Sequence, residues 1–415
     1  MSNHPAPPKV CLIGGGMIAH DQLLPSLYQL QRLDVIGEIS VCSLHGKTTR
    51  ALAEAEGIRN AFPGFSFVRY PKDDSGPYPM LYRDVIAGLP PRQIVVACVP
   101  DPLHFDVVMT ALRHDQHVLC VKPLVLKAAH AEQIEREARA RGLVVGVEYH
   151  KRFDDRSLMA RRRYREGMFG EFKLGTACLM EKWYYRHSNF QNWCTVENSD
   201  AFTYIGCHYV DLVHFITGLL PRSVSLYGIP EKYPNGNEGF LWTDARVIWQ
   251  NGACLNVQNS LSFPDAAPGS NTQGISLYFS SREVGGWMEH SDQYRGLRYS
   301  YVRKPEGAGT TQFAEPSPDY FAYIDLGGPG LVPTGYGYRS VDYIIRQCIR
   351  VETEASTLEA RQKLLKEIDD AGVMATPANS RYNELVTEAG RLSIMNAGKE
   401  VLIEYGDTPH VRFRD

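Results

Sequence analysis

The chain has 415 residues, more than one average domain usually contains, so two domains are expected. Hydrophobic residues make up 44% and charged residues 22%, which are ordinary values for a globular protein with sizeable cores. Lys and Arg together number 44 against 47 for Asp and Glu, so the formal net charge is −3. This balance gives no electrostatic reason to expect a nucleic acid or an anionic membrane as a partner.

The same sequence bears on the cellular compartment. No segment approaches the roughly 20 apolar residues needed to cross a bilayer, and the N-terminus lacks the pattern of a secretion signal. The nine cysteines are scattered and form no CxxC pair. Such a set argues against a disulfide scaffold and a zinc site, so no metal is predicted and a cytoplasmic protein is expected.

The first 148 residues alternate short apolar strands with amphipathic helices. Strands are predicted over residues 10–13, 39–42, 94–99, 117–121 and 143–148, and helices after the first strand and over residues 47–56, 101–113 and 128–141. Residues 94–99 form the nearly continuous apolar run that is typical of a strand buried on both faces of a parallel sheet. The alternation predicts an α/β fold with a doubly wound parallel sheet, assigned to residues 1–148.

From residue 149 the pattern becomes rich in strands. Strands are predicted over residues 172–180, 223–228, 245–249, 253–258 and 275–279, and helices over residues 156–166, 206–217 and much of 341–397. Residues 71–79 and 304–333 are rich in Gly, Pro and Ser and are the most loop-like segments. Residues 149–415 are therefore assigned to a second α/β domain.

A glycine-rich motif follows the first strand. Residues 14–19 read GGGMIA and match the dinucleotide-binding pattern G-x-G-x-x-G/A. Gly14 permits the tight turn, Gly16 lets a pyrophosphate approach the backbone, and the small Ala19 lets the helix pack on the strand. Glycines also make ordinary turns, but this strand–turn–helix context favours a dinucleotide, with its phosphates at the helix N-terminus.

The end of the second strand bears on the choice between NAD and NADP. Domains that prefer NAD usually place Asp or Glu there, whereas this chain has Ser43 and His45, followed by Lys47 and Arg50. No carboxylate is present at this position to repel a 2′-phosphate, and Lys47 and Arg50 could reach one. Exposed cations at such places are, however, usually only solvated. NAD and NADP both stay open, with a slight inclination toward tolerance of NADP.

Two further segments carry groups suited to acid–base chemistry. Lys122 directly follows an apolar strand, and Pro123 ends that strand and can fix the direction of the lysine, including through a cis bond. The alternative is an ordinary exposed lysine. His208 lies three residues before Asp211 on one helix face, so the carboxylate could orient the imidazole. A helix-terminal histidine satisfied by its neighbours is the alternative, and it is favoured when this segment is taken alone.

Five motifs together resemble the Gfo/Idh/MocA family, which contains inositol, glucose and other sugar dehydrogenases and reductases. In the family's order they are GGGMIA at 14–19, PDPLH at 100–104, VKP at 121–123, YHKRF at 149–153 and GCHYVD at 206–211. The resemblance implies an N-terminal Rossmann domain and a C-terminal domain with an open, largely antiparallel mixed sheet. A sugar or cyclitol substrate would lie between that sheet and the nicotinamide. The family's open sheet commonly packs against a second subunit, which implies a homodimer or homotetramer formed through it.

The resemblance also implies catalytic roles. Lys122 matches the lysine of the family's Glu-Lys-Pro motif, and His208 matches its catalytic histidine. The sequence departs from the family at two positions. Val121 stands in place of the motif's glutamate, and Tyr204 in place of an aspartate often found four residues before the histidine. Which group orients His208 is therefore open.

These motifs supply three groups of candidate site residues. The catalytic candidates are Lys122, His208 and Tyr204. The cofactor-binding candidates are Gly14, Gly16, Met17, Ile18, Ser43, His45, Lys47, Pro100, His104 and Lys122. The substrate-binding candidates are Lys122, Tyr149, His150, Arg152, Trp193, His208 and Asp211.

Two side-chain clusters in the second half leave alternatives open. One is an aromatic cluster, which would either stack on a sugar ring or belong to a core or interface: Trp183, Tyr184, Tyr185 and Trp193. The other is a polar cluster, which would either bind substrate hydroxyls or form a solvated turn: His290, Asp292, Gln293 and Arg295.

The leading hypothesis is an oxidoreductase that transfers a hydride between NAD(P) and a secondary alcohol or ketone of a sugar, sugar derivative or cyclitol. His208 suits the general base at neutral pH, because an ordinary imidazole titrates near 6.5, and Lys122 would stabilise negative charge developing on the substrate oxygen. One alternative is a non-catalytic NAD(P)-binding sensor. The other is a cofactor-retaining enzyme that cleaves glycosides by transient ring oxidation.

Overall fold

The protein is described here by a computed structural model covering residues 6–182, 186–264, 271–290, 296–301, 311–316 and 320–415. Its residues divide into two compact units. Unit 1 comprises Met1–Leu158, Tyr323–Glu388 and Ile403–Val411, and unit 2 comprises Met159–Ala322, Ala389–Leu402 and Arg412–Asp415. This division differs from the predicted single boundary after residue 148, because much of the helical tail packs against the first sheet and its helices.

Unit 1 contains a six-stranded sheet in which every neighbouring pair is parallel. Its strands are β1 (Val10–Ile13), β2 (Ile39–Cys42), β3 (Val68–Tyr70), β4 (Ile94–Ala97), β5 (His117–Val121) and β6 (Val145–Glu148). Their order is β3-β2-β1-β4-β5-β6, which confirms the doubly wound parallel sheet. β1, β2 and β4 are buried at every residue, as the apolar runs predicted.

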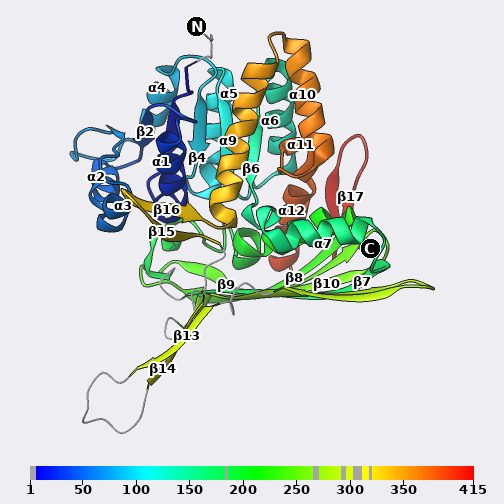
Figure 1. The fold of residues 1–415 in the computed structure, drawn as a ribbon. Coiled ribbons are helices and arrows are strands. Elements are labelled where there is room, and N and C mark those ends of the chain that lie inside the picture. The colour runs from blue at the N-terminus through cyan, green and yellow to red at the C-terminus, as the bar shows by residue number, and fades with distance from the viewer. Residues whose placement is uncertain (1–5, 183–185, 265–270, 291–295, 302–310, 317–319) are drawn as a thin grey trace. The chain divides into compact units, whose positions relative to one another are not determined.

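Helices cover both faces of this sheet. The helices of unit 1 are η1 (Ala19–Leu23), α1 (Leu24–Arg32), α2 (Gly46–Glu54), α3 (Glu56–Ala61), α4 (Leu81–Ala87), η2 (Asp101–Leu103), α5 (His104–Arg113), α6 (Ala128–Arg141), η3 (His150–Phe153), α9 (Tyr336–Glu354), α10 (Leu358–Ala371) and α11 (Pro377–Ser380). Figure 1 shows α1 and α9 on one face and α5 and α6 on the other. The predicted helix over residues 47–56 is wrong as a single helix, because Ala55 leaves the helical region at ψ 113° and separates α2 from α3.

Unit 2 is built on an eight-stranded mixed sheet. Its strands are β7 (Glu171–Lys182), β8 (Pro221–Lys232), β9 (Glu238–Trp249), β10 (Cys254–Phe263), β11 (Thr272–Ser280), β12 (Gly285–His290), β17 (Val401–Glu404) and β18 (His410–Phe413). They lie in the order β12-β11-β7-β10-β9-β8-β17-β18. β7 and β10 are parallel, whereas β8, β9, β11 and β12 pair antiparallel with their neighbours, which confirms the largely antiparallel mixed sheet.

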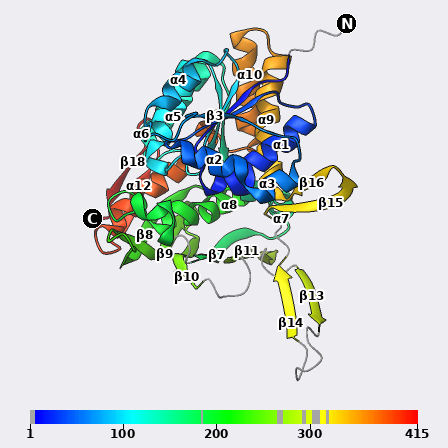
Figure 2. The ribbon, with the colours of Figure 1, turned by 90° about the vertical axis from the view of Figure 1, so that its left-hand side faces the viewer.

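One face of the unit 2 sheet is covered and the other is open. Buried and exposed residues alternate along β9, as expected for a sheet with one buried face. The π-helical turn η6 (Phe202–Gly206) packs on β7, β9 and β10, and Figure 2 shows the helix that continues it, α8 (Cys207–Thr217), along the same face. Within the described part of the chain, no helix lies on the opposite face (Figure 1).

The remaining elements complete the description. They are α7 (Asp155–Arg165), η5 (Asn189–Asn192), α12 (Tyr382–Ile394) and two ribbons, β13 (Gly296–Tyr301) with β14 (Thr311–Pro316) and β15 (Ala322–Gly328) with β16 (Gly330–Thr334). The loop expected over residues 304–333 therefore contains strands. Its Gly- and Pro-rich composition hid them, because β15 is a largely exposed ribbon without the alternating apolar pattern of a half-buried strand. Across the described residues, no helix is both long and apolar enough to span a membrane.

Candidate active site

The glycine turn after β1 fits a dinucleotide. Gly14 has φ +119°, and a Cβ there would lie 2.3 Å from the carbonyl oxygen of Cys98, so only glycine is accommodated. Its N–H donates to the carbonyl of Cys42 at 2.8 Å, which ties the turn to the end of β2. A Cβ on Gly16 would meet nothing within 4 Å, so the backbone is open to a ligand at this point.

The helix begins directly after this turn. Met17 and Ile18 are its first helical residues, and Ala19 is fully buried, so the predicted close packing of helix and strand is present. The helix N-terminus thus lies where the motif requires it for a pyrophosphate. Gln22 is buried within the same helix and donates a hydrogen bond to Glu148 at the carboxyl end of β6.

Two carboxylates from the loop after β3, which the sequence analysis did not select, lie against the start of α2. Arg50 forms an ion pair with Asp74, and a Cβ on Gly46 would clash with the carbonyl of Asp73, so the loop after β3 lies against the start of α2. Hydrogen bonds from Ser75 and Tyr78 lower the pKa of Asp73 to about 2. Negative charge is therefore supplied here from residues 73 and 74 rather than from β2 itself.

The three cofactor candidates in this region differ in exposure. Ser43 is half-buried and donates its backbone N–H to the carbonyl of Tyr70. His45 is half-buried and precedes the first residue of α2 in extended conformation. Lys47 is exposed in the first turn of that helix. Their contact with a cofactor stays a prediction.

His104 joins the loops that follow β4 and β5. Its Nδ1 lies 2.8 Å from the carbonyl oxygen of Pro123, and its Nε2 lies 2.8 Å from that of Val99. The ring is fully buried. His104 thus links the loops that follow β4 and β5, next to the half-buried Pro100, and its contact with the cofactor stays a prediction.

Lys122 follows β5 immediately and is buried. The Lys122–Pro123 peptide bond is cis, the conformation that the sequence analysis allowed for. The position is at the carboxyl edge of a parallel sheet, where ligands bind in open α/β folds.

A second buried charge occupies the same edge on the neighbouring strand. Glu148 ends β6 and faces Val121 in the parallel register. Its carboxylate accepts hydrogen bonds from Gln22 Nε2 at 2.7 Å and from the hydroxyl of Ser340, and its Oε2 lies 3.0 Å from His150 Nδ1. The sequence analysis did not select Glu148, because a strand register is not visible in a sequence; a carboxylate ending an apolar strand was the available signal.

The YHKRF segment separates into buried and partly exposed residues. Tyr149 and Arg152 are both buried; Arg152 donates to the hydroxyl of Tyr382 at 3.2 Å, and its guanidinium lies 5.9 Å from the centre of the Tyr149 ring. The His150 ring stacks on Tyr336 at 5.5 Å, with an interplanar angle of 25°. Of these substrate-binding candidates, His150 is the partly exposed one, with 13% of its side chain accessible.

In unit 2, His208 and Asp211 are both buried in the first turns of α8. A Cβ on Gly206 would lie 2.4 Å from Asn259 Oδ1, so glycine lets this segment approach β10 closely. Tyr204 is half-buried in the preceding π-helical turn and packs edge-on against Phe190, with ring centres 4.6 Å apart. π-helical turns are frequent at functional sites.

Two other features of unit 2 concern the predicted residues. Half-buried Trp193 lies 5.9 Å from the Tyr204 ring, so these two candidates share an aromatic cluster with Phe190. Buried Asp200, which the sequence analysis did not select, accepts from the Thr203 N–H at 2.7 Å and pairs with Arg391 at 3.2 Å, and so anchors the start of the π-helical turn. His290 ends β12 opposite Ile275. The candidates outside the described residues are Trp183, Tyr184, Tyr185, Asp292, Gln293 and Arg295.

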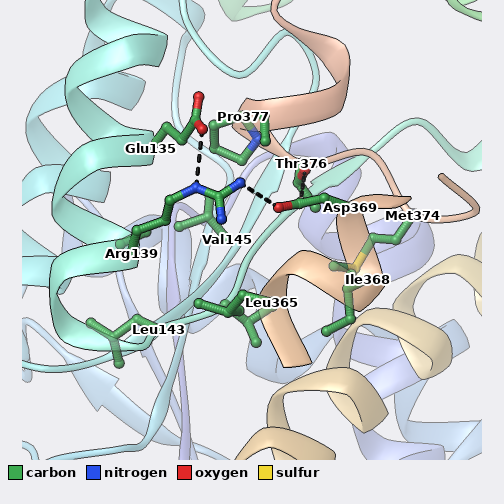
Figure 3. A pocket seen from close by; sticks show the side chains of 13 residues that line it. Glu135, Arg139, Leu143, Val145, Leu365, Ile368, Asp369, Met374, Thr376 and Pro377 are labelled. Atoms are coloured by element: carbon green, nitrogen blue, oxygen red, sulfur yellow. Dashed lines mark hydrogen bonds and ion pairs between the residues drawn. The ribbon is translucent and has the colours of Figure 1, made fainter. Parts of the chain in front are cut away.

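A small cavity in unit 1 is lined by charged groups that already bond to one another, so it is not a candidate active site. It measures about 30 Å³, room for roughly one water, and lies among α6, α10 and α11 (Figure 3). Arg139 bridges Glu135 at 3.1 Å and Asp369 at 2.6 Å, and Thr376 donates to the same Asp369 carboxylate. Its charged groups hold the three helices together.

The side chains of the described residues do not indicate a metal site. Among the described residues, no group of three or more His, Cys, Asp or Glu could hold a metal ion. All nine cysteines are present as thiols rather than disulfides.

The glycine turn, the helix after it and the parallel sheet define a dinucleotide-binding domain. Residues 9–149 match the Gfo/Idh/MocA family, described as an oxidoreductase family with an NAD-binding Rossmann fold. These residues are thus similar to the NAD-binding domain of that oxidoreductase family.

Curated relatives match part of the chain. D-glucoside 3-dehydrogenase of Escherichia coli is 27% identical over 218 residues, which are 51% of this chain and 55% of the relative. The scyllo-inositol 2-dehydrogenase (NADP(+)) IolW of Bacillus subtilis is 22% identical over 219 residues, 52% of this chain and 53% of the relative. The chain thus matches about half the length of each.

Solved structures match nearly the whole chain. GenD2 from gentamicin A biosynthesis, in complex with NAD, has a TM-score of 0.65 at 16% identity and covers 97% of this chain and 98% of its own. A scyllo-inositol dehydrogenase from Lactobacillus casei, with bound NAD(H) and scyllo-inositol, has a TM-score of 0.61 at 14% identity, covering 95% and 99%. At these identities the likeness is one of fold.

Proposed function

We propose that the protein is an NAD(P)-dependent dehydrogenase or reductase acting on a secondary alcohol or ketone of a sugar, sugar derivative or cyclitol. The observation that carries this proposal is a buried lysine, Lys122, at the ligand-binding edge of an NAD-binding domain of an oxidoreductase family. The printed names of the relatives, a glucoside dehydrogenase and an inositol dehydrogenase, support the substrate class.

The cofactor would be held by the turn and loops of unit 1. Gly14 and Gly16 fit this role, because the turn is closed to a side chain at the first position and open to a ligand at the second. The residues proposed to contact the cofactor are Gly14, Gly16, Met17, Ile18, Ser43, His45, Lys47, Pro100, His104 and Lys122. When bound, the nicotinamide accepts or donates the hydride.

We propose NAD as the preferred form. The expected tolerance of NADP rested on the lack of a carboxylate at the end of β2. Asp74 now pairs with Arg50, one of the two cations that could have bound a 2′-phosphate, and Asp73 lies against Gly46. Two carboxylates near this position would repel a 2′-phosphate.

The chain's own residues would handle the alcohol proton. Lys122 would donate a hydrogen bond to the reacting oxygen and stabilise its negative charge, and His208 would accept the hydroxyl proton. Both side chains are buried, which limits competition from water. Tyr204 and Asp211 would tune His208, and His150 and Trp193 would contact the substrate. Tyr149 and Arg152 would act through the packing of their segment.

We propose that the protein self-associates through the open face of the unit 2 sheet, as a homodimer or homotetramer. Leu174, Tyr278 and Trp287 are 47–59% exposed and are register neighbours on β7, β11 and β12. A contiguous row of exposed large hydrophobic residues is typical of a protein interface. The nine thiols further favour a reducing compartment such as the cytoplasm.

Val121 and Tyr204 keep two alternatives open. Both positions lack the carboxylate that the family resemblance implies, so a non-catalytic NAD(P)-binding sensor and a cofactor-retaining glycoside-cleaving enzyme are the competing functions. The first would bind without turnover. The second would release an aglycone with no net consumption of NAD(P).

The test is to incubate the purified protein with NAD⁺ or NADP⁺ and a panel of inositols, hexoses, sugar acids and glycosides, following the absorbance of the reduced cofactor. The proposal predicts accumulation of reduced cofactor with at least one polyol. A cofactor-induced rise in melting temperature without reduced cofactor on any substrate would overturn it. Release of aglycone would then identify the glycoside-cleaving alternative.

A further inference from the structure

A large cavity in unit 1 has no part in the proposed reaction. It measures about 660 Å³, a volume typical of small-molecule sites. Its walls come from the segment before β1 (residues 6–8), the turn after α1 (residues 34–35), the start of β4 (residues 92–94), His117 and the last turns of α9 (within residues 346–354), all in unit 1. The cavity therefore lies at the amino-terminal edge of the parallel sheet, whereas the glycine turn and Lys122 lie at the carboxyl edge.

The carboxylates that α9 contributes to this cavity are already paired. Glu352 lies 2.9 Å from the Nε2 of His117 and 2.8 Å from a terminal nitrogen of Arg361. Glu354 pairs with Nε of Arg350 at 3.0 Å. The charges of these two carboxylates are therefore compensated within the protein, and they leave little negative charge to repel a bound anion.

Two guanidinium groups in the wall keep hydrogen-bond donors for a ligand. Arg92 uses one terminal nitrogen, Nη1, for two backbone carbonyls at 3.1 and 3.3 Å and for Glu352 at 3.8 Å, and Arg346 uses Nε for Asp342 at 2.8 Å. Among the described residues, nothing bonds to Nε and Nη2 of Arg92 or to the two terminal nitrogens of Arg346. Burial and the nearby charge of Arg361 lower the pKa of Arg92, so this cation is short of counter-charge and would be stabilised by an anion.

The rest of the wall is suited to a hydroxylated carbon skeleton. Asp34 is exposed, and its carboxylate forms no hydrogen bond or ion pair with the part of the chain that the structure describes. A carboxylate only accepts, so it would take the protons of ligand hydroxyls. Pro7, Val35 and Ile349 add apolar surface for the carbon atoms of a ligand. Two cations with unused donors outweigh this one unpaired carboxylate.

We propose that this cavity is a second ligand site, which binds a polyhydroxylated anion such as a sugar phosphate or a sugar acid. Arg92 and Arg346 bind the phosphate or carboxylate, because a guanidinium offers paired N–H donors that match the oxygens of such groups. Asp34 accepts hydrogen bonds from the hydroxyls. The inference does not depend on the proposed function, since none of the proposed catalytic or cofactor-binding residues lines the cavity.

The first test is calorimetric titration of the full-length protein, without added cofactor, with glucose 6-phosphate, gluconate, glucose and inorganic phosphate. We expect a Kd below about 1 mM for one or both sugar anions, and binding at least about tenfold weaker for glucose and for inorganic phosphate. The two sugar anions distinguish a phosphate from a carboxylate as the charged group. Glucose binding as tightly as the sugar anions would overturn the role of the arginines, and inorganic phosphate binding as tightly would overturn the role of the hydroxyls. Absence of binding by both sugar anions would overturn the site.

Variants then locate the bound anion. Arg346→Gln should raise the Kd at least about tenfold, as expected for the loss of a hydrogen-bonded charge, and its half-exposed side chain makes general unfolding of the variant unlikely to intervene. Arg92→Gln should act in the same direction, although loss of its bonds to backbone carbonyls also lowers stability. The matched control is Arg113→Gln, an exposed arginine at the end of α5 that does not line the cavity, and it should keep the wild-type Kd.

A steric variant separates the cavity from the surface charge around it. Val35→Trp keeps every charge but fills part of the cavity, and should abolish binding of the sugar anion. Wild-type affinity in Val35→Trp or in Arg346→Gln would overturn the inference, because the anion would then bind elsewhere, including the proposed active site. An equal loss in Arg113→Gln would also overturn it, since that result would reflect the net charge of the protein. A protein that turns over no polyol but binds the anion in this pattern contradicts only the proposed function.

Discussion

Val121 and Glu148 face each other across the parallel ladder of β5 and β6. The resemblance to the Gfo/Idh/MocA family implies a glutamate at the position of Val121, and here a buried carboxylate stands one strand away. The carboxyl edge of the sheet thus keeps a negative charge next to the strand that ends at Lys122. The carboxylate of Glu148 forms a hydrogen bond with His150.

Loss of Lys122 or of His208 should suppress turnover. We expect Lys122→Ala and His208→Ala each to lower kcat by about 10² to 10⁴, the usual contribution of an acid–base group. NADH binding should change no more than about twofold in His208→Ala, because His208 is not among the proposed cofactor contacts. Steady-state kinetics and NADH fluorescence titration measure the two effects. Lys127→Ala, five residues away and exposed, is the control. Normal kcat in both active-site variants would rule out their assignment.

Asp74 should set the choice of cofactor. Asp74→Asn removes the charge that pairs with Arg50, so the guanidinium becomes available to a 2′-phosphate. We expect the ratio of the Kd for NADP⁺ to that for NAD⁺ to fall by about tenfold, which corresponds to about 1.4 kcal/mol. Calorimetric titration measures it. The exposed Asp84→Asn on α4 should not change the ratio; an unchanged ratio in Asp74→Asn would contradict the prediction.

His117 should make stability depend on pH. Burial lowers the pKa of His117 in the folded state, whereas the unfolded chain keeps a value near 6.5. Below about pH 6.5 the unfolded state therefore binds more protons, and the free energy of unfolding falls as the pH decreases from 7.5 to 5.5. Urea unfolding should show this loss in the wild type and a smaller one in His117→Gln.

The same variant tests the hydrogen bonds of His117. We expect His117→Gln to lose about 1–3 kcal/mol at pH 7.5, because the Val144 N–H loses its acceptor in a buried place. His114→Gln, exposed three residues earlier, should change neither the stability nor its pH dependence. A wild-type pH profile in His117→Gln would mean that other groups cause the effect.

The exposed row on the unit 2 sheet should mediate self-association. Tyr278→Lys combined with Trp287→Lys places two charges on neighbouring strands, and large aromatic residues often dominate interface energies. We expect the subunit dissociation constant to rise at least about a hundredfold, seen as a smaller mass by light scattering. Met395→Lys, equally exposed but after α12, should keep the wild-type mass. A wild-type protein that is already a monomer would refute the interface.

The sequence predicted best those elements that are buried on all sides. β1, β2 and β5 have the bounds expected from their apolar runs, because a strand covered on both faces must be apolar throughout. β3 and β15 were not predicted, since neither has a run of buried residues. Short exposed strands are fixed by their partners and leave little trace in local composition.

The site was predictable where one segment carries the whole chemistry. The turn at Gly14 needs only its own strand and helix, so the motif was sufficient. The carboxylate that pairs with Arg50 comes from a different loop, and the partners of His104 are two backbone carbonyl groups. Such contacts depend on strand order and register, which residue periodicity does not encode.

The interleaving of the two units has a consequence for biosynthesis. All six strands of the nucleotide-binding sheet have been translated by residue 148, yet Ser340, which bonds Glu148, follows 192 residues later, and Glu388, which accepts from the Ala128 N–H, follows 260 residues after that partner. Val147 on β6 likewise waits for its bridge to Ala375. During translation, the Rossmann sheet therefore emerges before the segments that cover its edge strand β6. In that interval the exposed strand edge is most prone to aggregation and most in need of a chaperone.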